Sequence, residues 1–431
     1  MAAQIRFGHT KVGTSRLSRR AALGGLIAAA GAAAFGTKSG RAQDAKAPVG
    51  DSAQLADLGM ELSPQQRTTG VAFLERHASV DTHCHPGRFF LSHLPYQTPT
   101  TQSFGEPFEE QAIADLNAGH VSAALFAAVA DMRLIEATPQ GALHASREFQ
   151  PGEAYADYRR QLDELKMLVK NHELARGLNA SDVYAAQHRH QTAAIFAVEG
   201  GDFIEDKLER LHEAFSDGVR AITIVHYHVN QIGDIQTEAP VHAGLTAFGK
   251  SVIREMNRTG IIVDLAHSTF AVSKDVLDVS TKPVMISHTN LATPTLNHPR
   301  LISSEHAKLV AAAGGIVGSW PSGIGHKTFA DYIDSIQRLV DSVGIEHVAI
   351  GTDMDANFRP VFRSYRDWSL IPAALLARGM HEAEVANIMG GNFLRVFKDQ
   401  SFARAAELVS VRRAALPADP KPRQATAPVR P

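Results

Sequence analysis

Five apolar segments of the chain each end in a side chain that can bind a divalent metal ion. The first ends in His83-Cys84-His85, and alternate residues of a strand point to the same face, so His83 and His85 are expected to project together. The other four segments end in Glu199, His267, His288 and Asp353. A single histidine at a strand end is more often a hydrogen-bonded structural residue than a ligand. Five such endings, in order along one chain, predict a metal site.

The elements that must position these side chains alternate between apolar runs and helical patterns. Strand candidates lie at residues 79–83, 122–129, 194–199, 220–226, 261–266, 283–288, 314–318 and 347–352. Helical patterns between them include residues 155–173, 207–216, 245–257, 305–313 and 329–342. Near-continuous apolar strands that alternate with helices are typical of a parallel sheet buried on both faces.

The sequence therefore predicts an α/β fold, a (β/α)8 TIM barrel, with its chemistry at the C-terminal ends of the strands. Residues 86–119 and 227–243 both follow strand ends. They are expected to shape the pocket on that face of the barrel.

Composition and charge narrow the class of partner. The chain has 431 residues and 44% hydrophobic side chains, which suits one large barrel domain with additional termini. Residues 1–42 contain seven Lys or Arg and no Asp or Glu, so the remainder carries 36 basic and 45 acidic residues, a net charge of −9. This acidic body argues against nucleic acid and anionic membranes as partners. The single cysteine, Cys84, excludes an internal disulfide and a cysteine-rich zinc site.

The N-terminus is interpreted as an export signal. Ser18-Arg19-Arg20 is typical of a twin-arginine signal peptide, which we place at residues 1–42, and the apolar run after it is shorter than the roughly 20 residues of a membrane span. Residues 43–60 are expected to form a linker, 61–410 the barrel domain and 411–431 a disordered tail. The mature protein is then expected to be periplasmic or secreted, with no stable membrane span after signal cleavage. An uncleaved N-terminal anchor is the alternative.

Several local segments, in this order and spacing, resemble the membrane (renal) dipeptidase family of zinc metallopeptidases, which are built on amidohydrolase-type barrels. The resemblance covers residues 75–400, and its longest match is the stretch from Gly244 to His267. Shorter matches lie at residues 197–201, 283–288, 297–300, 350–355 and 390–397.

This resemblance implies a centre of two zinc ions per chain. By position, His83 and His85 bind the first zinc, His267 and His288 complete the second, and Glu199 bridges both. A carboxylate suits the bridging place because its two oxygens can span two metal ions about 3.5 Å apart. The family usually has His-x-Asp at the first motif. With His85 in place of the aspartate, the first site loses one negative charge.

Three further residues receive roles from the resemblance. His226 matches the histidine that polarises the scissile carbonyl, and Arg300 matches the arginine that holds the substrate carboxylate. A planar guanidinium suits that task because it can donate two parallel hydrogen bonds. Asp353 matches the aspartate that moves a proton between the bridging water and the leaving amine.

Three other polar residues carry weaker expectations. Asp81 is expected either to orient His83 or to be an ordinary strand-end aspartate. Asp264 lies in an apolar run, where an unpaired carboxylate is costly, so it should bond backbone groups or a ligand histidine. His228 is expected to be a solvated loop residue rather than a third imidazole of the pocket.

The predicted function is a binuclear zinc-dependent dipeptidase, in which a metal-bridging hydroxide attacks the peptide bond of a dipeptide or a similar small carboxylate-bearing substrate. The nearest alternative is another amidohydrolase-type hydrolase, acting on a β-lactam, a lactone or an N-acyl amino acid. A second alternative is a non-catalytic metal-binding barrel. A homodimer is also considered.

Overall fold

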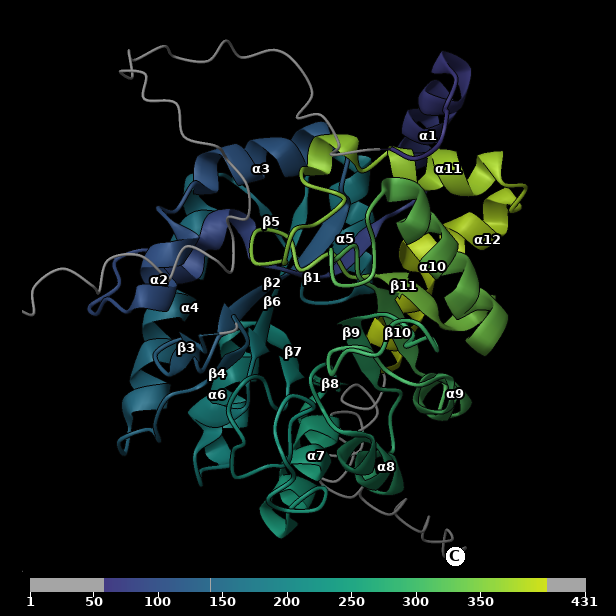
Figure 1. Ribbon diagram of the computed structural model, residues 1–431. Coiled ribbons are helices and arrows are strands. Elements are labelled where there is room, and N and C mark those ends of the chain that lie inside the picture. Colours follow the sequence, from purple (N-terminus) through teal and green to yellow (C-terminus); the bar gives the residue numbers. More distant parts are fainter. Residues whose placement is uncertain (1–57, 140, 401–431) are drawn as a thin grey trace, which may run out of the picture.

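The computed structural model describes residues 58–139 and 141–400 and shows a barrel of parallel strands surrounded by helices (Figure 1). The barrel strands are β1 (Val80–Cys84), β2 (Ala123–Val129), β6 (Ala193–Glu199), β7 (Val219–Thr223), β8 (Ile262–Asp264), β9 (Met285–Thr289), β10 (Ile316–Ser319) and β11 (Val348–Ile350). Each pairs with the next in this order, and β11 pairs with β1, so the ring is closed. The predicted (β/α)8 barrel is confirmed, with all eight strand candidates in place.

The apolar runs form strands because each is buried on both faces. Along β6, Ile195 and Ala197 pack inside the barrel in one hydrophobic cluster, whereas Phe196 and Val198 pack outward against the helices in another. This alternation places Glu199, which follows Ala197 by two residues, at the mouth of the barrel interior. The two-residue strand β5 (Ala175–Arg176) pairs with the start of β6.

Helices cover the outside of the ring and confirm the helical patterns named above. They are α1 (Pro64–Arg76), α2 (Pro99–Phe104), α3 (Glu109–Ala118), α4 (Glu153–Asn171), α5 (Ala180–His188), α6 (Glu209–Asp217), α7 (Ala247–Thr259), α8 (Phe270–Val279), α9 (Ser304–Ala312), α10 (Phe329–Val343), α11 (Leu370–Ala377) and α12 (Glu382–Ala386). Several begin at a side-chain cap, such as Thr246 for α7 and Ser303 for α9. Among the described residues, no helix is both long and apolar enough to cross a membrane.

The segments after β1 and β2 hold structure that the sequence patterns did not specify. The excursion at residues 86–119 contains the 3-10 helix η2 (Pro86–Leu91) as well as α2 and α3. After β2, the chain forms an antiparallel hairpin of β3 (Ile135–Ala137) and β4 (Leu143–Ala145). The expected signal peptide, the expected tail and all but the last residues of the expected linker lie outside the described residues.

Candidate metal centre

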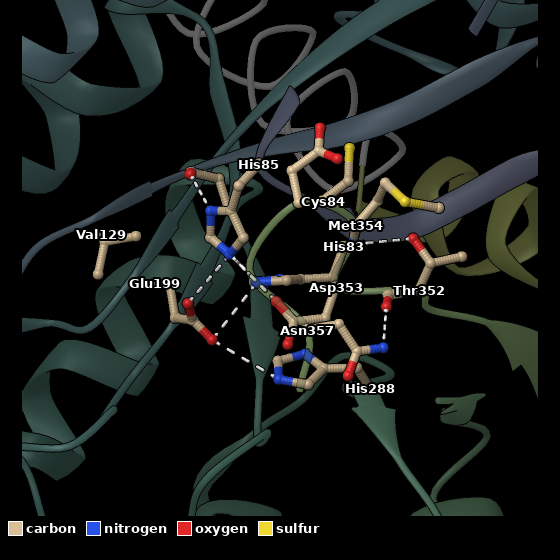
Figure 2. Close-up of polar contacts among 12 residues, drawn as sticks. His83, Cys84, His85, Val129, Glu199, His288, Thr352, Asp353, Met354 and Asn357 are labelled. Atoms are coloured by element: carbon tan, nitrogen blue, oxygen red, sulfur yellow. Dashed lines mark hydrogen bonds and ion pairs between the residues drawn. The ribbon is translucent and has the colours of Figure 1, made fainter. Parts of the chain in front are cut away.

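Glu199 is the centre of the candidate site. It is buried at the C-terminal end of β6, and five imidazole rings surround its carboxylate. Their Nε2 atoms lie close to a Glu199 oxygen, at 3.1 Å for His267, 3.4 Å for His83, His85 and His226, and 3.6 Å for His288. Figure 2 shows His83, His85 and His288 directed toward Glu199. The structure therefore brings together every residue that the sequence placed in the metal centre.

Short distances between ring nitrogens join both expected pairs, and His226 also lies with His267 and Glu199 in one group of close ligand atoms. The Nε2 atoms of His83 and His85 are 3.2 Å apart, and those of His267 and His288 are 3.3 Å apart. The carboxylate divides them differently, because His85 and His226 are nearest to Oε2 and the other three to Oε1. A carboxylate can turn about its terminal bond more freely than buried strands can move, so the nitrogen pairs define the two ligand sets better than the carboxylate oxygens do.

His83 and His85 share one side because they are alternate residues at the end of β1, where the strand pairing is irregular. The pairing of β1 with β2 shifts register between Asp81 and Cys84, as in a β-bulge. His83 and His85 face the barrel mouth, whereas the Cys84 thiol points away from Glu199 and donates to the Leu125 carbonyl at 3.4 Å (Figure 2). Cys84 is fully buried there, which agrees with a packing role.

Buried hydrogen bonds hold the first histidine pair in place. Asp81 accepts the backbone N–H groups of His83 at 3.1 Å and Thr352 at 2.9 Å, together with the hydroxyls of Thr352 and Tyr365. It thus ties β1 to the segment after β11, which carries Asp353. Asp81 thus contacts His83 through its backbone N–H, whereas the imidazole Nδ1 lies 3.5 Å from the Ser287 hydroxyl. Burial raises the pKa of Asp81 even though these four donors oppose the shift.

Asp264 plays the same part on the other side of the barrel. Its carboxylate accepts the backbone N–H of Ala266 at 3.0 Å and of Ser287 at 2.8 Å, as well as the Thr223 hydroxyl at 2.6 Å. The expected backbone partners are therefore present. They link β8 to β9, the strand that carries His288.

Two site residues have a backbone conformation that is rare for their type. His267 and Asp353 each lie three residues beyond a strand end, and their φ angles are 66° and 54°. Such left-handed conformations are uncommon outside glycine and cluster at functional sites. Backbone hydrogen bonds fix both turns, from Gln236 N–H to the His267 carbonyl at 2.8 Å and from Asp353 N–H to the His83 carbonyl at 2.9 Å.

His226 is oriented by a partner that the sequence analysis missed. Asp131 lies just after β2, is fully buried, and accepts from His226 Nδ1 at 2.6 Å and from the Tyr227 backbone N–H at 2.9 Å. Burial would lower the pKa of His226, but the negative charges of Asp131 and Glu199 outweigh it and raise that pKa. The available signal was that Asp131 follows the apolar run of residues 122–129, one of two strand candidates, with residues 314–318, left without a named polar residue.

His228 departs from its expected place in solvent. It is buried, and its Nδ1 lies 2.6 Å from Asp202 Oδ1, while its Nε2 lies 3.1 Å from Glu148. The preference for a solvated loop residue was wrong because the loop folds back over the end of β6, where Asp202 supplies an ionic partner. His228 does not line the pocket above Glu199.

Arg300 lies beside the second histidine pair. Its Nη1 donates to Gln236 Oε1 at 2.7 Å, and its Nη2 lies 3.0 Å from His288 Nε2. The guanidinium also sits 5.3 Å from the centre of the Trp320 ring. It is 2% exposed, yet its Nε has no hydrogen-bond partner among the described residues. A buried donor without a partner is costly, so this arginine is poised for an acceptor that enters the pocket.

The charge states differ between the two histidine pairs of the site, and His85 must give up a proton to bind a metal ion. Burial would raise the pKa of Glu199, but the imidazoles of His226 and His83 outweigh it and hold that pKa well below its usual range. Burial lowers the pKa values of His267 and His288, which keeps both imidazoles neutral. For His85, hydrogen bonds to Asp353 and Glu199 overcome the effect of burial and raise the pKa to about 10.

The ring contacts also fit a metal. The Nδ1 atom of His85 donates to the Ala127 carbonyl at 2.8 Å, that of His288 lies 3.0 Å from the Ser287 hydroxyl, and that of His226 is held by Asp131. Metal-binding histidines typically engage one ring nitrogen in this way and present the other to the ion. Neutral imidazoles with a carboxylate are a donor set that zinc prefers. The residues present therefore fit the expected metal centre.

A pocket opens above Glu199. His85, His226, His267, Arg300 and Asp353 line its polar part. Asp353 Oδ1 lies 3.3 Å from His85 Nε2, so a carboxylate borders the centre at the pocket side. The predicted catalytic and substrate-binding residues thus share one cavity with three of the predicted ligands, His85, Glu199 and His267.

Comparison with known proteins gives one consistent result. Residues 69–410 match the family model described as membrane dipeptidase, peptidase family M19. The dipeptidase verJ of Clonostachys rogersoniana is 31% identical over 265 residues, which cover 59% of this chain and 68% of the relative, and mouse dipeptidase 3 is 30% identical over 50% of this chain and 46% of its own length. This chain therefore spans between about half and two thirds of these curated relatives.

Solved structures agree on the fold. The probable dipeptidase PvdM from Pseudomonas aeruginosa superposes with a TM-score of 0.65 at 18% identity, over 79% of this chain and 100% of that one. At this level of identity, the likeness bears on the fold alone.

Proposed function

The chain belongs to the membrane dipeptidase family of peptide-bond hydrolases, and from this premise we propose that it is a dipeptidase that uses two zinc ions bridged by Glu199. The observation that carries the proposal is the convergence of five imidazole Nε2 atoms on one buried carboxylate. His83 and His85 would hold one ion, and His267 and His288 the other. When bound, the zinc ions supply a water of lowered pKa as the nucleophile and polarise the carbonyl that it attacks.

The remaining pocket residues bind and orient the substrate. Arg300 has a free Nε–H and would receive the C-terminal carboxylate, for which a guanidinium is the suited donor. His226 is fixed through Nδ1 by Asp131, so its Nε2 faces the pocket and can donate to the scissile carbonyl oxygen. Asp353 lines the same cavity and can pass a proton to the leaving amine.

Alternative substrates, such as β-lactams, N-acyl amino acids and lactones, differ in whether they carry a carboxylate that Arg300 could bind. A β-lactam or an N-acyl amino acid can bring a carboxylate to Arg300, whereas a simple lactone cannot. Arg300 and Asp353 share one pocket, which favours a substrate whose leaving amine and carboxylate belong to the same residue, as in a dipeptide. We also propose that the chain is exported by the twin-arginine route to the periplasm, on the basis of Arg19 and Arg20.

Elemental analysis of the purified protein beside a dipeptide screen tests the proposal. We expect two zinc ions per chain and release of both amino acids from L,L- or L,D-dipeptides. Glu199→Ala should lose both ions and fall to background activity, since the bridging ligand serves both sites. Glu110→Ala, at an exposed position on α3, is the matched control and should retain both. A zinc-loaded protein that opens lactones or β-lactams but cleaves no dipeptide would contradict the assignment.

A further inference from the structure

The pocket above Glu199 has two unlike halves. Its polar half contains His85, Glu199, His226, His267, Arg300 and Asp353. Its other half, which we call the apolar wall, is made by six side chains from β2 and from the segments after β1 and β2: Phe90, Phe104, Val129, Met132, Ile135 and Leu143. Tyr227, Trp320 and Ala356 line the pocket elsewhere. The part of the chain that the structure describes places no charged side chain on this wall.

The apolar wall lies across the barrel from Arg300. In the closed ring, three strands separate β2 from β9 in either direction, so the two strand ends are opposite each other. Met132, Ile135 and Leu143 follow β2, whereas Arg300 follows β9. The metal centre lies between these ends.

Val129 joins the wall to the metal centre. It is the register partner of Glu199 in the pairing of β2 with β6. In Figure 2, Val129 lies beside Glu199 on the side away from His288. The apolar surface therefore begins next to the bridging carboxylate, on the side opposite to the histidine that Arg300 contacts.

Nearby charges are turned away from the wall. Arg133 is adjacent in sequence to Met132, but its Nε pairs with Glu153 at 3.0 Å and its guanidinium stacks on Tyr96 at 4.4 Å. Met132 and Ile135 are 1% and 3% exposed. A polar or charged group placed against these side chains would lose water without gaining a partner.

We propose that the apolar wall is the subsite for the side chain of the substrate's N-terminal residue, and that it selects large apolar side chains such as Leu, Met or Phe. This inference rests on the proposed dipeptidase function. With the C-terminal carboxylate at Arg300 and the scissile carbonyl at the metal centre, the N-terminal residue must extend toward β1 and β2. Apolar side chains would bury surface there, and charged ones would be excluded.

A series of dipeptides with Ala as the second residue tests the subsite. We expect kcat/KM for Leu-Ala and Phe-Ala to exceed that for Gly-Ala by about 10-fold or more, because even one methylene in an apolar pocket is worth about 10-fold. Asp-Ala and Lys-Ala should be no better than Gly-Ala. The mirror series, with Ala first and the second residue varied, should show a weaker preference.

A variant at the rim of the wall separates specificity from stability. Leu143 is half-buried in β4, so Leu143→Asp adds a charge with little disturbance of the core. The ratio of kcat/KM for Leu-Ala over Gly-Ala should fall by about 10-fold. Met167→Asp, on the outer face of α4, is the matched control and should leave the ratio unchanged. A merely structural effect would lower both substrates together and would not move the ratio.

Failure of the subsite and failure of the dipeptidase function give different results. If no dipeptide is hydrolysed by the zinc-loaded protein, the proposed function fails, and the subsite with it. If dipeptides are hydrolysed but Gly-Ala or Lys-Ala equals Leu-Ala, or the preference appears only at the second position, the function stands and the subsite is overturned.

Discussion

At the scale of single residues, Arg300 shows how much a buried guanidinium can define a substrate. Two of its nitrogens already contact Gln236 and His288, while Nε remains without a partner. A lysine could keep the positive charge at this place, but it could not keep the planar set of donors. The recognition of a carboxylate by Arg300 is therefore a matter of geometry as well as charge.

We predict that Arg300→Lys lowers kcat/KM for dipeptides by about 10- to 100-fold, as expected for a lost hydrogen bond to a charged group. Blocking the substrate's C-terminus as an amide should cost the parent enzyme a similar factor and cost the variant little. Steady-state kinetics with free and amidated substrates measures both. Arg189→Lys, at an exposed position, is the control. Equal losses from amidation in parent and variant would show that Arg300 does not read the carboxylate.

His85 is the departure from the family's usual His-x-Asp ligand pattern, and replacing it by aspartate tests the effect of that departure. Its Nε2 lies 3.3 Å from Asp353 and 3.4 Å from Glu199. We predict that His85→Asp binds zinc more tightly, because a third carboxylate increases the attraction for the ion, and that its metal-free form is less stable, because the carboxylates then repel one another. A chelator titration and thermal melts with and without zinc measure the two effects.

His120→Asp, at an exposed position, provides the control for that pair of measurements. Unchanged zinc retention in His85→Asp would mean that His85 is not a ligand.

Polar residues of the site could be predicted from the sequence where they end an apolar run, but their partners in distant segments could not. His83, Glu199 and His288 could be found because each ends an apolar run. Asp131 could not be assigned to His226, because the two lie 95 positions apart and meet only when the barrel closes. The burial of His228 escaped prediction for the same reason, since its partner Asp202 follows a different strand.

At the scale of elements, the barrel narrows sharply just below the metal centre. Thr82 of β1 donates to the Ser287 carbonyl of β9 at 2.6 Å and to the Ile350 carbonyl at 2.9 Å. A Cβ atom on Gly318 or Gly351 would lie 1.8 Å from that Ser287 oxygen. Both glycines are therefore required for the strands that carry His83 and His288 to approach each other across the barrel.

We predict that Gly318→Ala destabilises the protein by about 1 to 3 kcal/mol, the usual cost of overpacking, and weakens zinc binding, because the strand that carries His288 must move. Chemical denaturation and zinc content report the two effects. Gly325→Ala is the control, since its nearest non-local atom would be 3.5 Å away. A stable Gly318→Ala protein with full zinc content would contradict the close approach described here.

The elements themselves were largely predictable, because each barrel strand is a nearly continuous apolar run. The hairpin of β3 and β4 was not, since its three-residue strands are partly exposed and carry no regular alternation. The hairpin helps to enclose the pocket through Ile135 and Leu143, and this tertiary contact is not visible in the sequence. The glycine contacts inside the barrel were hidden too. Gly318 and Gly351 fall within the predicted strands at residues 314–318 and 347–352, but a sequence does not show which backbone atom approaches them.

At the scale of the whole molecule, the metal centre ties together strands from all around the ring. The candidate ligands come from β1, β6 and β9 and from the turn after β8, with Asp353 after β11. In the unfolded chain these groups lie far apart, so a preformed site exists only in the folded state. Zinc should therefore act as a ligand that stabilises the barrel as a whole.

We predict that removing zinc with a chelator lowers the melting temperature. Free zinc at 1,000 times its dissociation constant stabilises the folded state by about 4 kcal/mol, which corresponds to roughly 5 to 10 °C for a domain of this size. Restoring zinc should restore the melting temperature, which differential scanning calorimetry measures. Glu199→Gln keeps the size of the side chain but removes its charge, so its melting temperature should respond little to chelator. A parent protein that melts identically with and without zinc would show that these buried histidines do not depend on a metal for their arrangement.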